Sequence, residues 1–224
     1  MVGNNNKNAF WQALLATLVI FLLGITIGFL FELSRNTQVE NTLYLSEVSL
    51  LDQQTQSQIV NTFVSTCNDS KTSLFESADT IYADANLLEQ YDSTSKFQNT
   101  LTILHKRYDL LRLLVLAQSM ELKNRCNLPF HTIVYLYSYG TDSLETKAEE
   151  STVSQILTDM KDKHGDDLLL LPIAANLNLS SVNVLLKSYN ITQLPALIID
   201  ENRTMTYPFS TSNVEQNVFR NTEN

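Results

Sequence analysis

A run of 23 residues without a single charge, 9–31, is the feature that most constrains how this chain can fold. It reads AFWQALLATLVIFLLGITIGFLF, and as a helix it would be roughly 34 Å long, enough to cross a hydrocarbon core of about 30 Å with some tilt. Phe10 and Trp11 stand at its start, where aromatic rings favour the lipid interface. The alternatives are a buried helix of a soluble protein and a cleaved signal peptide, but the following FELSRN offers no small-x-small cleavage site. The sequence therefore predicts an uncleaved transmembrane anchor over 9–31, preceded by a short tail over 1–8.

The orientation of this anchor depends on positively charged residues at its ends, and the chain has few of them. Lys7 precedes the run and Arg35 follows it. Because the preceding tail is very short and the following part has 193 residues, we expect a signal anchor in the cell membrane, with a cytoplasmic N-terminus and an extracytoplasmic C-terminal part. Four Asn-x-Ser/Thr triplets permit glycosylation of that part, at Asn68, Asn178, Asn190 and Asn202.

The charge and the anchor together indicate which partners to expect. The chain has 24 acidic and 15 basic side chains, a formal net charge of −9, which repels a phosphate backbone, so nucleic acid is not an expected partner. The lipid bilayer is one partner. Within the anchor, Gly24 and Gly28 form a GxxxG pair that can let two spanning helices approach closely. A homodimer through the glycine face is one interpretation, and the alternative is that glycine is simply common in spanning helices.

Residues 34–125 contain no glycine and no proline, so nothing over 92 residues has to break a helix. One helix is predicted from an apolar seam with spacings of three and four residues, at Phe97, Leu101, Leu104, Tyr108, Leu111, Val115, Gln118 and Leu122. A second seam comes before it, at Leu74, Ala78, Ile81, Ala85 and Leu88. Between them DSTS, 92–95, is typical of a turn with N-capping residue types. The pattern predicts an antiparallel helical hairpin over 67–126. A juxtamembrane stalk helix over 32–66 precedes it, where the polar gap QQTQSQ weakens the case for a long coiled coil.

The hairpin gives the two cysteines of the chain a testable geometry. If the turn centres near residue 93, Cys67 faces Met120, and Cys126 lies about 9 Å further along at helical rise. A disulfide needs Cα atoms within about 7 Å, so modest curvature of the loops would let the two cysteines pair. An even number of cysteines also fits one disulfide in an oxidising compartment. We predict a bridge between Cys67 and Cys126, and the alternative is two free thiols in small apolar niches.

From residue 127 onward the pattern changes, and 127–224 is predicted to form an α/β domain. Strands are indicated by β-rich or apolar runs: IVYLYS at 133–138, LLLLPI at 168–173, PALIID at 195–200 and TMTYP at 204–208. Helices are predicted from about Leu144 to His164 with Gly165 as the stop, from Ser180, and from a cap near Ser212. The predicted order is β-α-β-α-β-β-α, interpreted as two parallel crossover units followed by a hairpin and a helix.

This order, together with YNITQLPALIID at 189–200, resembles the thioredoxin fold. Members of that family have a tyrosine-x-isoleucine-x-x-x-proline-x-hydrophobic stretch here, which Tyr189, Ile191 and Pro195 match. The resemblance covers about residues 127–220, less than half of the chain. It implies that the Leu194–Pro195 peptide is cis; the alternative is an ordinary trans proline at the first residue of a strand.

In the thioredoxin family the loop after the first strand carries a Cys-x-x-Cys motif whose first thiol is activated at a helix N-terminus. Here the corresponding loop reads SYGTDS, 138–143, and contains no sulfur. Cys126 precedes the strand and lies near 20 Å from its far end at about 3.3 Å per residue, so thiol-disulfide exchange of the usual kind is not expected. The resemblance implies that a groove for extended peptides is retained, with candidate binding residues Tyr139, Gly140, Thr141, Leu194 and Pro195.

No other catalytic, cofactor-binding or metal-binding constellation emerges from the sequence. The three histidines are scattered without cysteine or carboxylate at ligand spacing, and we expect satisfied surface or interface residues at His105, His131 and His164. Three tyrosines alternate on one predicted strand, so they are expected to share a face and to pack under a helix, with ligand stacking as the alternative: Tyr135, Tyr137 and Tyr139.

These features predict a redox-inactive, membrane-anchored module that binds or assembles a protein partner outside the cytoplasm and is not an enzyme. One alternative is a membrane-tethered dimeric spacer built from the anchor and the stalk. A second alternative is a thiol oxidoreductase that uses Cys67 and Cys126 as its redox pair.

Overall fold

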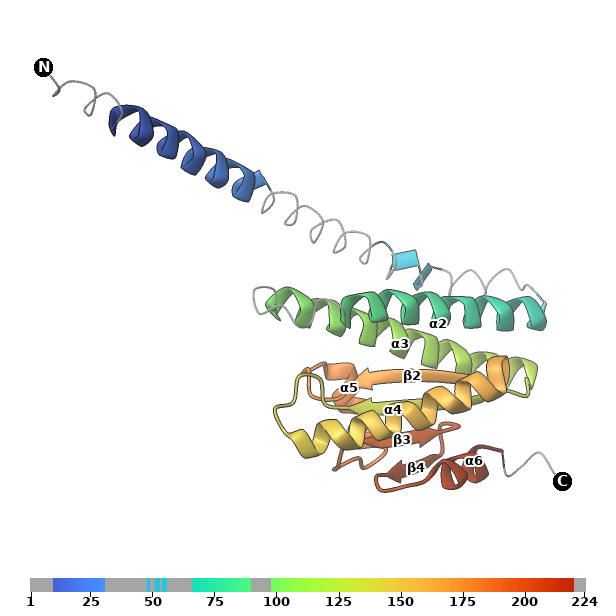
Figure 1. Ribbon diagram of the computed structural model, residues 1–224. Coiled ribbons are helices and arrows are strands. Elements are labelled where there is room, and N and C mark those ends of the chain that lie inside the picture. The colour runs from blue at the N-terminus through green and yellow to red at the C-terminus, as the bar shows by residue number, and fades with distance from the viewer. Residues whose placement is uncertain are drawn as a thin grey trace, which may run out of the picture. The chain divides into compact units, whose positions relative to one another are not determined.

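A computed structural model describes residues 10–30, 48, 51–52, 54–55, 66–89 and 98–219 (Figure 1). The chain divides into two compact units, 1–48 and 49–224, and each is described by itself. The predicted tail over 1–8, the turn over 92–95 and nearly all of the stalk over 32–66 lie outside the described residues.

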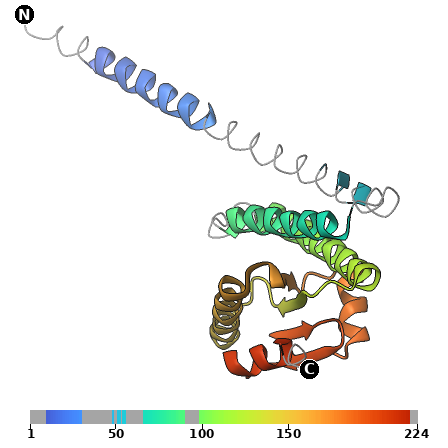
Figure 2. The same ribbon diagram turned by 90° about the vertical axis from the view of Figure 1, so that its right-hand side faces the viewer.

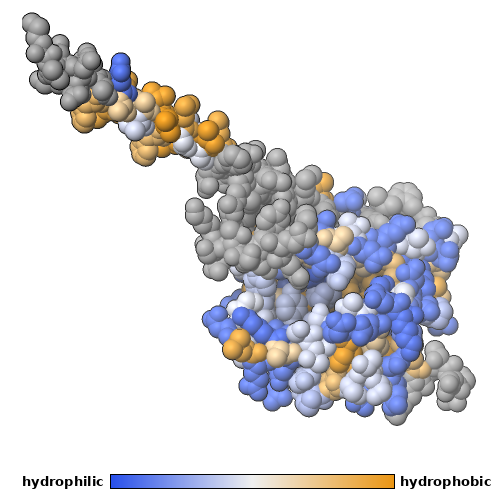
Figure 3. Space-filling view, in the orientation of Figure 1, coloured by the Kyte–Doolittle hydropathy of each residue, from blue (hydrophilic) through white to orange (hydrophobic). Residues whose placement is uncertain are grey.

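Apart from residue 48, the described part of the first unit is the helix Phe10–Leu30, which agrees with the predicted anchor to within one residue at each end. All of its side chains are exposed, and they form a mainly hydrophobic surface (Figure 3). The polar Thr17 and Thr26 donate their hydroxyl hydrogens to carbonyl oxygens one turn earlier, which leaves few unsatisfied groups on that surface. The helix is long and apolar enough to span a membrane.

The second unit begins with the predicted helical hairpin, formed by α2 (Cys67–Glu89) and α3 (Gln98–Cys126). A disulfide joins Cys67 to Cys126, with the two Cα atoms 5.8 Å apart, and this confirms the predicted pairing. The predicted register is wrong, however. Cys126 is the last helical residue of α3 and lies beside Cys67, the first residue of α2. Cys67 is therefore opposite Cys126 instead of Met120, and the bridge requires no curvature of a loop.

A four-stranded sheet follows, with the strands β1 (His131–Tyr137), β2 (Leu168–Ala174), β3 (Ala196–Ile199) and β4 (Arg203–Thr206). Their order across the sheet is β2-β1-β3-β4. β1 and β2 are parallel, whereas β3 runs antiparallel to β1 and β4 antiparallel to β3. The expectation of two parallel crossovers is therefore correct for β1 and β2 but wrong for β2 and β3, which run in opposite directions. All four side chains of β3 are buried, and a short run of buried apolar residues does not encode the direction of its strand.

Helices cover both faces and one edge of this sheet (Figures 1 and 2). On one face lie α4 (Leu144–His164) and α6 (Thr211–Phe219), and on the other lies α5 (Ser180–Ser188). The hairpin runs along β2, the edge strand, which explains why the hairpin and the sheet belong to one compact unit. A hydrophobic core fills the α4 and α6 side, with Ile133, Val153, Leu157, Met160, Leu168, Leu197, Ile199, Val214 and Val218 buried.

The helix ends of the sheet region agree only partly with the predicted caps. Ser143 accepts a hydrogen bond from the backbone nitrogen of Thr146 and begins α4, and Gly165 ends it at a φ of +52°, which favours glycine. Ser180 does not cap α5, because that helix follows Leu179 without a side-chain cap. At α6 the cap is Ser210 instead of Ser212. Its hydroxyl oxygen accepts from the backbone nitrogen of Asn213, 3.3 Å away.

Candidate functional site

The end of β1 and the loop after it, 138–143, form the centre of the candidate site. The loop is fixed at Tyr139, whose backbone nitrogen donates to Asn176 Oδ1 at 2.9 Å and whose carbonyl accepts from Asn176 Nδ2 at 2.8 Å. One residue earlier, the Ser138 backbone nitrogen donates to Glu150 Oε1 at 2.6 Å. Gly140 then turns the chain at a φ of +67°, a region that strains other residues. Two side chains and a glycine thus hold an exposed loop in one conformation.

This loop lines a cavity of about 570 Å³ together with residues of α3 and α4. Three of the predicted binding residues, Tyr139, Gly140 and Thr141, are among its lining residues. The structure places the other two elsewhere, because Leu194 and Pro195 line neither this cavity nor the smaller one beside it. Pro195 is buried before β3, its carbonyl accepts from the Tyr207 backbone nitrogen at 3.1 Å, and the expected cis peptide after Leu194 is confirmed.

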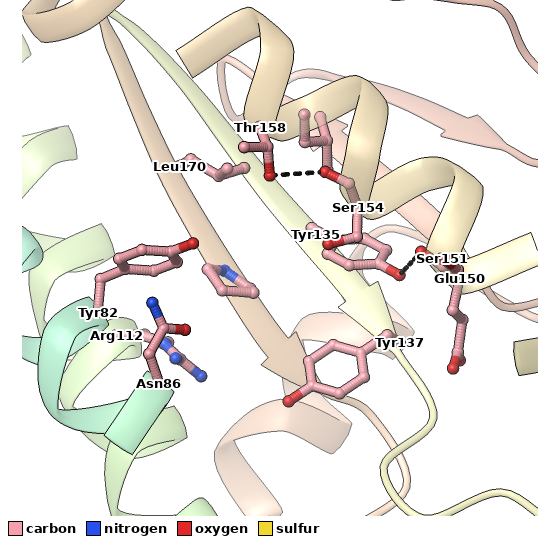
Figure 4. Close-up of a pocket in the computed structure, with 12 residues that line it drawn as sticks. Tyr82, Asn86, Arg112, Tyr135, Tyr137, Glu150, Ser151, Ser154, Thr158 and Leu170 are labelled. Atoms are coloured by element: carbon pink, nitrogen blue, oxygen red, sulfur yellow. Dashed lines mark hydrogen bonds between the residues drawn. The ribbon is translucent and has the colours of Figure 1, made fainter. Parts of the chain in front are cut away.

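A smaller cavity of about 300 Å³ lies next to the first and shares Tyr137 and Glu150 with it. Its walls come from five elements, α2, α3, β1, β2 and α4 (Figure 4). On the hairpin side lie Tyr82, Asn86 and Arg112, and on the α4 side lie Glu150, Ser151, Ser154 and Thr158. The lining is therefore rich in hydroxyl and amide groups, with one cation and one carboxylate.

Arg112 is held in this wall by a buried ion pair. Its Nη1 lies 3.3 Å from Asp109 Oδ1, and the two side chains are 7% and 1% exposed. The same oxygen accepts from the backbone nitrogen of Ala174, 3.3 Å away. Burial raises the pKa of Asp109 to about 7, although the charge of Arg112 and the Ala174 hydrogen bond act in the opposite direction. Within the part of the chain that the structure describes, Asp109 Oδ2 has no hydrogen-bond partner.

Glu150 lies on the opposite wall and joins the cavity to the loop. Burial raises its pKa, against the hydrogen bond from the Ser138 backbone nitrogen, and the neighbouring Glu149 raises it further. The hydroxyl of Tyr135 donates to the Glu150 carbonyl oxygen at 3.2 Å. Glu150 is thus a fixed, half-buried carboxylate at the boundary of two cavities.

Arg112, Asp109, Asn176 and Glu150 were missed by sequence reasoning. The predicted seam of α3 is narrow, but the helix also buries a second stripe, because it packs against both α2 and β2. That stripe contains His105, Asp109, Arg112, Leu116 and Ser119. The spacing of three and four residues in this polar stripe is the one signal that could have indicated it.

The predicted tyrosine row is shorter than expected. Tyr135 and Tyr137 stack with ring centroids 5.5 Å apart, but β1 ends at Tyr137. Tyr139 instead lies against the ring of the buried His105, with centroids 3.9 Å apart. The expectation that all three tyrosines share one strand is therefore wrong, since the chain turns into the loop after the second of them.

The other two histidines lie together at a different place, against α6. His131 and His164 contact the ring of Phe219, with centroids 4.8 Å and 4.0 Å apart. His131 Nδ1 lies 2.8 Å from Asp200, and His164 Nε2 lies 3.1 Å from Glu215. Among the described residues no group of three metal-ligating side chains occurs.

The remaining predicted site residues are the cysteines and the anchor glycines. Both cysteines of the chain are in the bridge, so neither is a free thiol. Gly24 and Gly28 lie one helical turn apart on the exposed surface of Phe10–Leu30, and a Cβ at either position would meet no atom within 4 Å. Comparison of the sequence with protein families and with curated proteins gives no match.

Proposed function

We infer that the chain is a single-pass membrane protein that displays a thioredoxin-like domain without redox cysteines, as a protein-binding or assembly module. Three features support the fold assignment: the order of elements from His131 to Phe219, the sheet order β2-β1-β3-β4, and the Tyr-x-Ile-x-x-x-Pro stretch before β3. The helix Phe10–Leu30 is the membrane anchor. In this proposal the N-terminus of the chain lies in the cytoplasm, and the part of the chain after the helix lies outside the cell membrane.

The observation that carries the binding function is the loop after β1. It contains no sulfur, it is held in place by Asn176 and Glu150, and it opens onto the 570 Å³ cavity. A preorganised loop beside a cavity of this size lowers the entropy that a ligand must lose on binding, which favours recognition of an extended peptide. Both cysteines are in the bridge at the open end of the hairpin, and neither belongs to the loop after β1.

Selection of peptides from a random library on the purified chain tests this function. Selected peptides should lose binding when a negative charge is placed in the cavity by Thr141→Glu or by Lys147→Glu. The matched control is Cys67→Ser, which should leave binding unchanged. Failure to select any peptide, or peptides whose binding both charged variants preserve, contradicts the proposal.

The two alternatives make different demands on the same protein. An oxidoreductase would reduce insulin and lose that turnover in Cys126→Ser, whereas the binding module has no turnover to lose. A dimeric spacer is favoured only by the glycine face of the anchor, where Gly24 and Gly28 are exposed. Its test is separate from peptide binding, because it concerns the membrane helix alone.

A further inference from the structure

The smaller cavity, which Arg112 lines, has charged side chains in its walls. Among its twelve lining residues there is one cation, Arg112, and one carboxylate, Glu150. In Figure 4 these two lie on opposite sides of the cavity, with Tyr137 between them. The guanidinium of Arg112 is directed toward the side on which Tyr137 lies. The cavity therefore presents two opposite charges to whatever occupies it.

Arg112 is built into this position. Its side chain is only 7% exposed, and its Nη1 lies 3.3 Å from Oδ1 of Asp109, a residue that does not line the cavity. Among the described residues this is the one hydrogen bond of the guanidinium, so its other N–H groups remain available. A buried arginine with unused donors is a strong binding group for a carboxylate, because the guanidinium fork matches both carboxylate oxygens.

The charge of Arg112 is only partly offset by Asp109, its ion-pair partner. Burial raises the pKa of Asp109 to about 7, so a substantial fraction of that carboxyl is protonated near neutral pH. Tyr82 and Asn86 lie next to Arg112 in the wall, and their hydroxyl and amide groups can add donors to an anion there.

The carboxylate of Glu150 determines which charges a ligand of this cavity must carry. A simple anion attracted by Arg112 would be repelled by Glu150, and a simple cation would meet the reverse problem. One oxygen of Glu150, Oε1, is held by the Ser138 backbone nitrogen, which fixes the carboxylate in place. A ligand with both charges satisfies both walls. The volume, about 300 Å³, is at the small end of ligand sites.

We propose that this cavity is a binding site for a small zwitterion, an amino acid or dipeptide, whose carboxylate pairs with Arg112 and whose ammonium pairs with Glu150. The hydroxyls of Ser154 and Thr158 and the ring of Tyr137 line the space between the two charges. The site goes beyond the peptide-binding function proposed above. The two cavities share Tyr137 and Glu150, but Tyr82, Asn86 and Arg112 line only this one.

The test uses the full chain in lipid nanodiscs and isothermal titration calorimetry with a series of free zwitterions. The series runs from glycine through 4-aminobutyrate and 6-aminohexanoate to dipeptides, because the length of the best ligand reports the span between the two charges. The matched probes are the N-acetylated and the amidated form of the best ligand. We expect removal of either charge of the ligand to weaken binding at least tenfold.

Two charge variants assign the ends of the ligand. In Glu150→Gln the free and the N-acetylated ligand should bind equally, because the partner of the ammonium is gone. In Arg112→Gln the free and the amidated ligand should bind equally, because the partner of the carboxylate is gone. Because Arg112 is buried and its loss can unfold the hairpin, Ser154→Trp is the third variant. It fills the cavity from an exposed position on α4 and should abolish binding while the thermal stability is unchanged.

Two results would overturn the proposal. One is the absence of binding by every zwitterion at millimolar concentration. The other is equal binding of free and capped ligands by the unaltered chain. Loss of peptide binding in Thr141→Glu with zwitterion binding intact would show that the two proposals succeed or fail separately.

Discussion

The Asp109 carboxylate accepts a hydrogen bond from the backbone nitrogen of Ala174, 3.3 Å away, and so joins helix α3 to the end of the edge strand β2. The two residues are 65 positions apart in the sequence. Burial raises the pKa of Asp109 to about 7, and the opposing effects of Arg112 and of this hydrogen bond do not offset it. A carboxyl group with a higher pKa in the folded than in the unfolded chain makes the free energy of unfolding depend on pH.

The sign of this dependence follows from proton binding. Between the usual carboxyl pKa near 4 and about 7, the folded chain retains a proton on Asp109 that the unfolded chain has released. The free energy of unfolding should therefore fall as the pH rises through this window, by up to about 4 kcal/mol from this group. Asp109→Asn should flatten the slope, measured by urea unfolding between pH 4.5 and pH 8. Asp79→Asn, at an exposed position of α2, is the control. Equal slopes in the unaltered chain and in Asp109→Asn would contradict the prediction.

The disulfide predicts a large effect of reduction. Cys67 and Cys126 are 59 positions apart, and a closed loop of that length restricts the unfolded chain by about 4 kcal/mol in the chain-entropy treatment. Reductant should lower the thermal unfolding temperature of the unaltered chain, and the double variant Cys67→Ser with Cys126→Ser should show the lower temperature without reductant. In intact cells, an impermeant thiol reagent should label the chain only after reduction. Labelling without reduction would show that the bridge does not form there.

A second cluster, around Asp200, predicts the opposite dependence on pH. Burial opposes ionisation of Asp200, but hydrogen bonds from His131 and the Thr132 backbone nitrogen and the charge of Lys123 outweigh it and lower the pKa. A lowered pKa contributes stability that is present above about pH 4 and is lost as the pH falls through the pKa of the folded state. The acid limb of the stability curve should therefore contain a contribution from this one carboxylate.

Asp200→Asn isolates that charge, because asparagine still accepts from Thr132 and tolerates the φ of +47° found at this turn position. We expect a loss of about 1–3 kcal/mol at pH 7, since Lys123 and His131 lose a part-buried partner, and a smaller loss at pH 3. Glu201→Gln, which removes an ion pair with Lys123 and none with His131, should lose less. A loss that is the same at both pH values would assign the effect to packing instead of charge.

The anchor glycines predict an association of two chains in the membrane. Gly24→Leu and Gly28→Leu place bulk on a surface that is open in the single chain, so neither should disturb the helix itself. Both should reduce the yield of a crosslinked dimer in membranes severalfold, while Gly28→Ala, which keeps a small residue, should reduce it less. A dimer that persists in both leucine variants would remove the glycine face from its interface.

Much of the sheet region could be predicted because its strands are long apolar runs and its helix ends are marked by typical capping residues. Five consecutive buried residues in β1, and Gly165 at the end of α4, are visible in the sequence alone. The direction of β3 is not visible, because Ala196–Ile199 is buried throughout and has no alternation that would distinguish its two orientations.

The candidate site was predicted only in part, because some of its residues are brought together by tertiary packing. Tyr139, Gly140 and Thr141 do line a cavity, since they follow a strand whose end is easily located. Arg112 was missed because a charged residue on a helix normally faces water. Its burial follows from packing of α3 along β2, which only the spacing of the polar stripe of α3 indicates in the sequence.

The bridge between the first residue of α2 and the last residue of α3 also determines how a mechanical load would travel. The chain from the membrane side reaches the hairpin at Cys67 and leaves it for β1 after Cys126. Tension applied between the anchor and the sheet passes through the two sulfur atoms, and the 58 residues between them lie outside its path. The hairpin and the cavity wall that it forms would thus keep their shape under a pull that strains the segments before and after them.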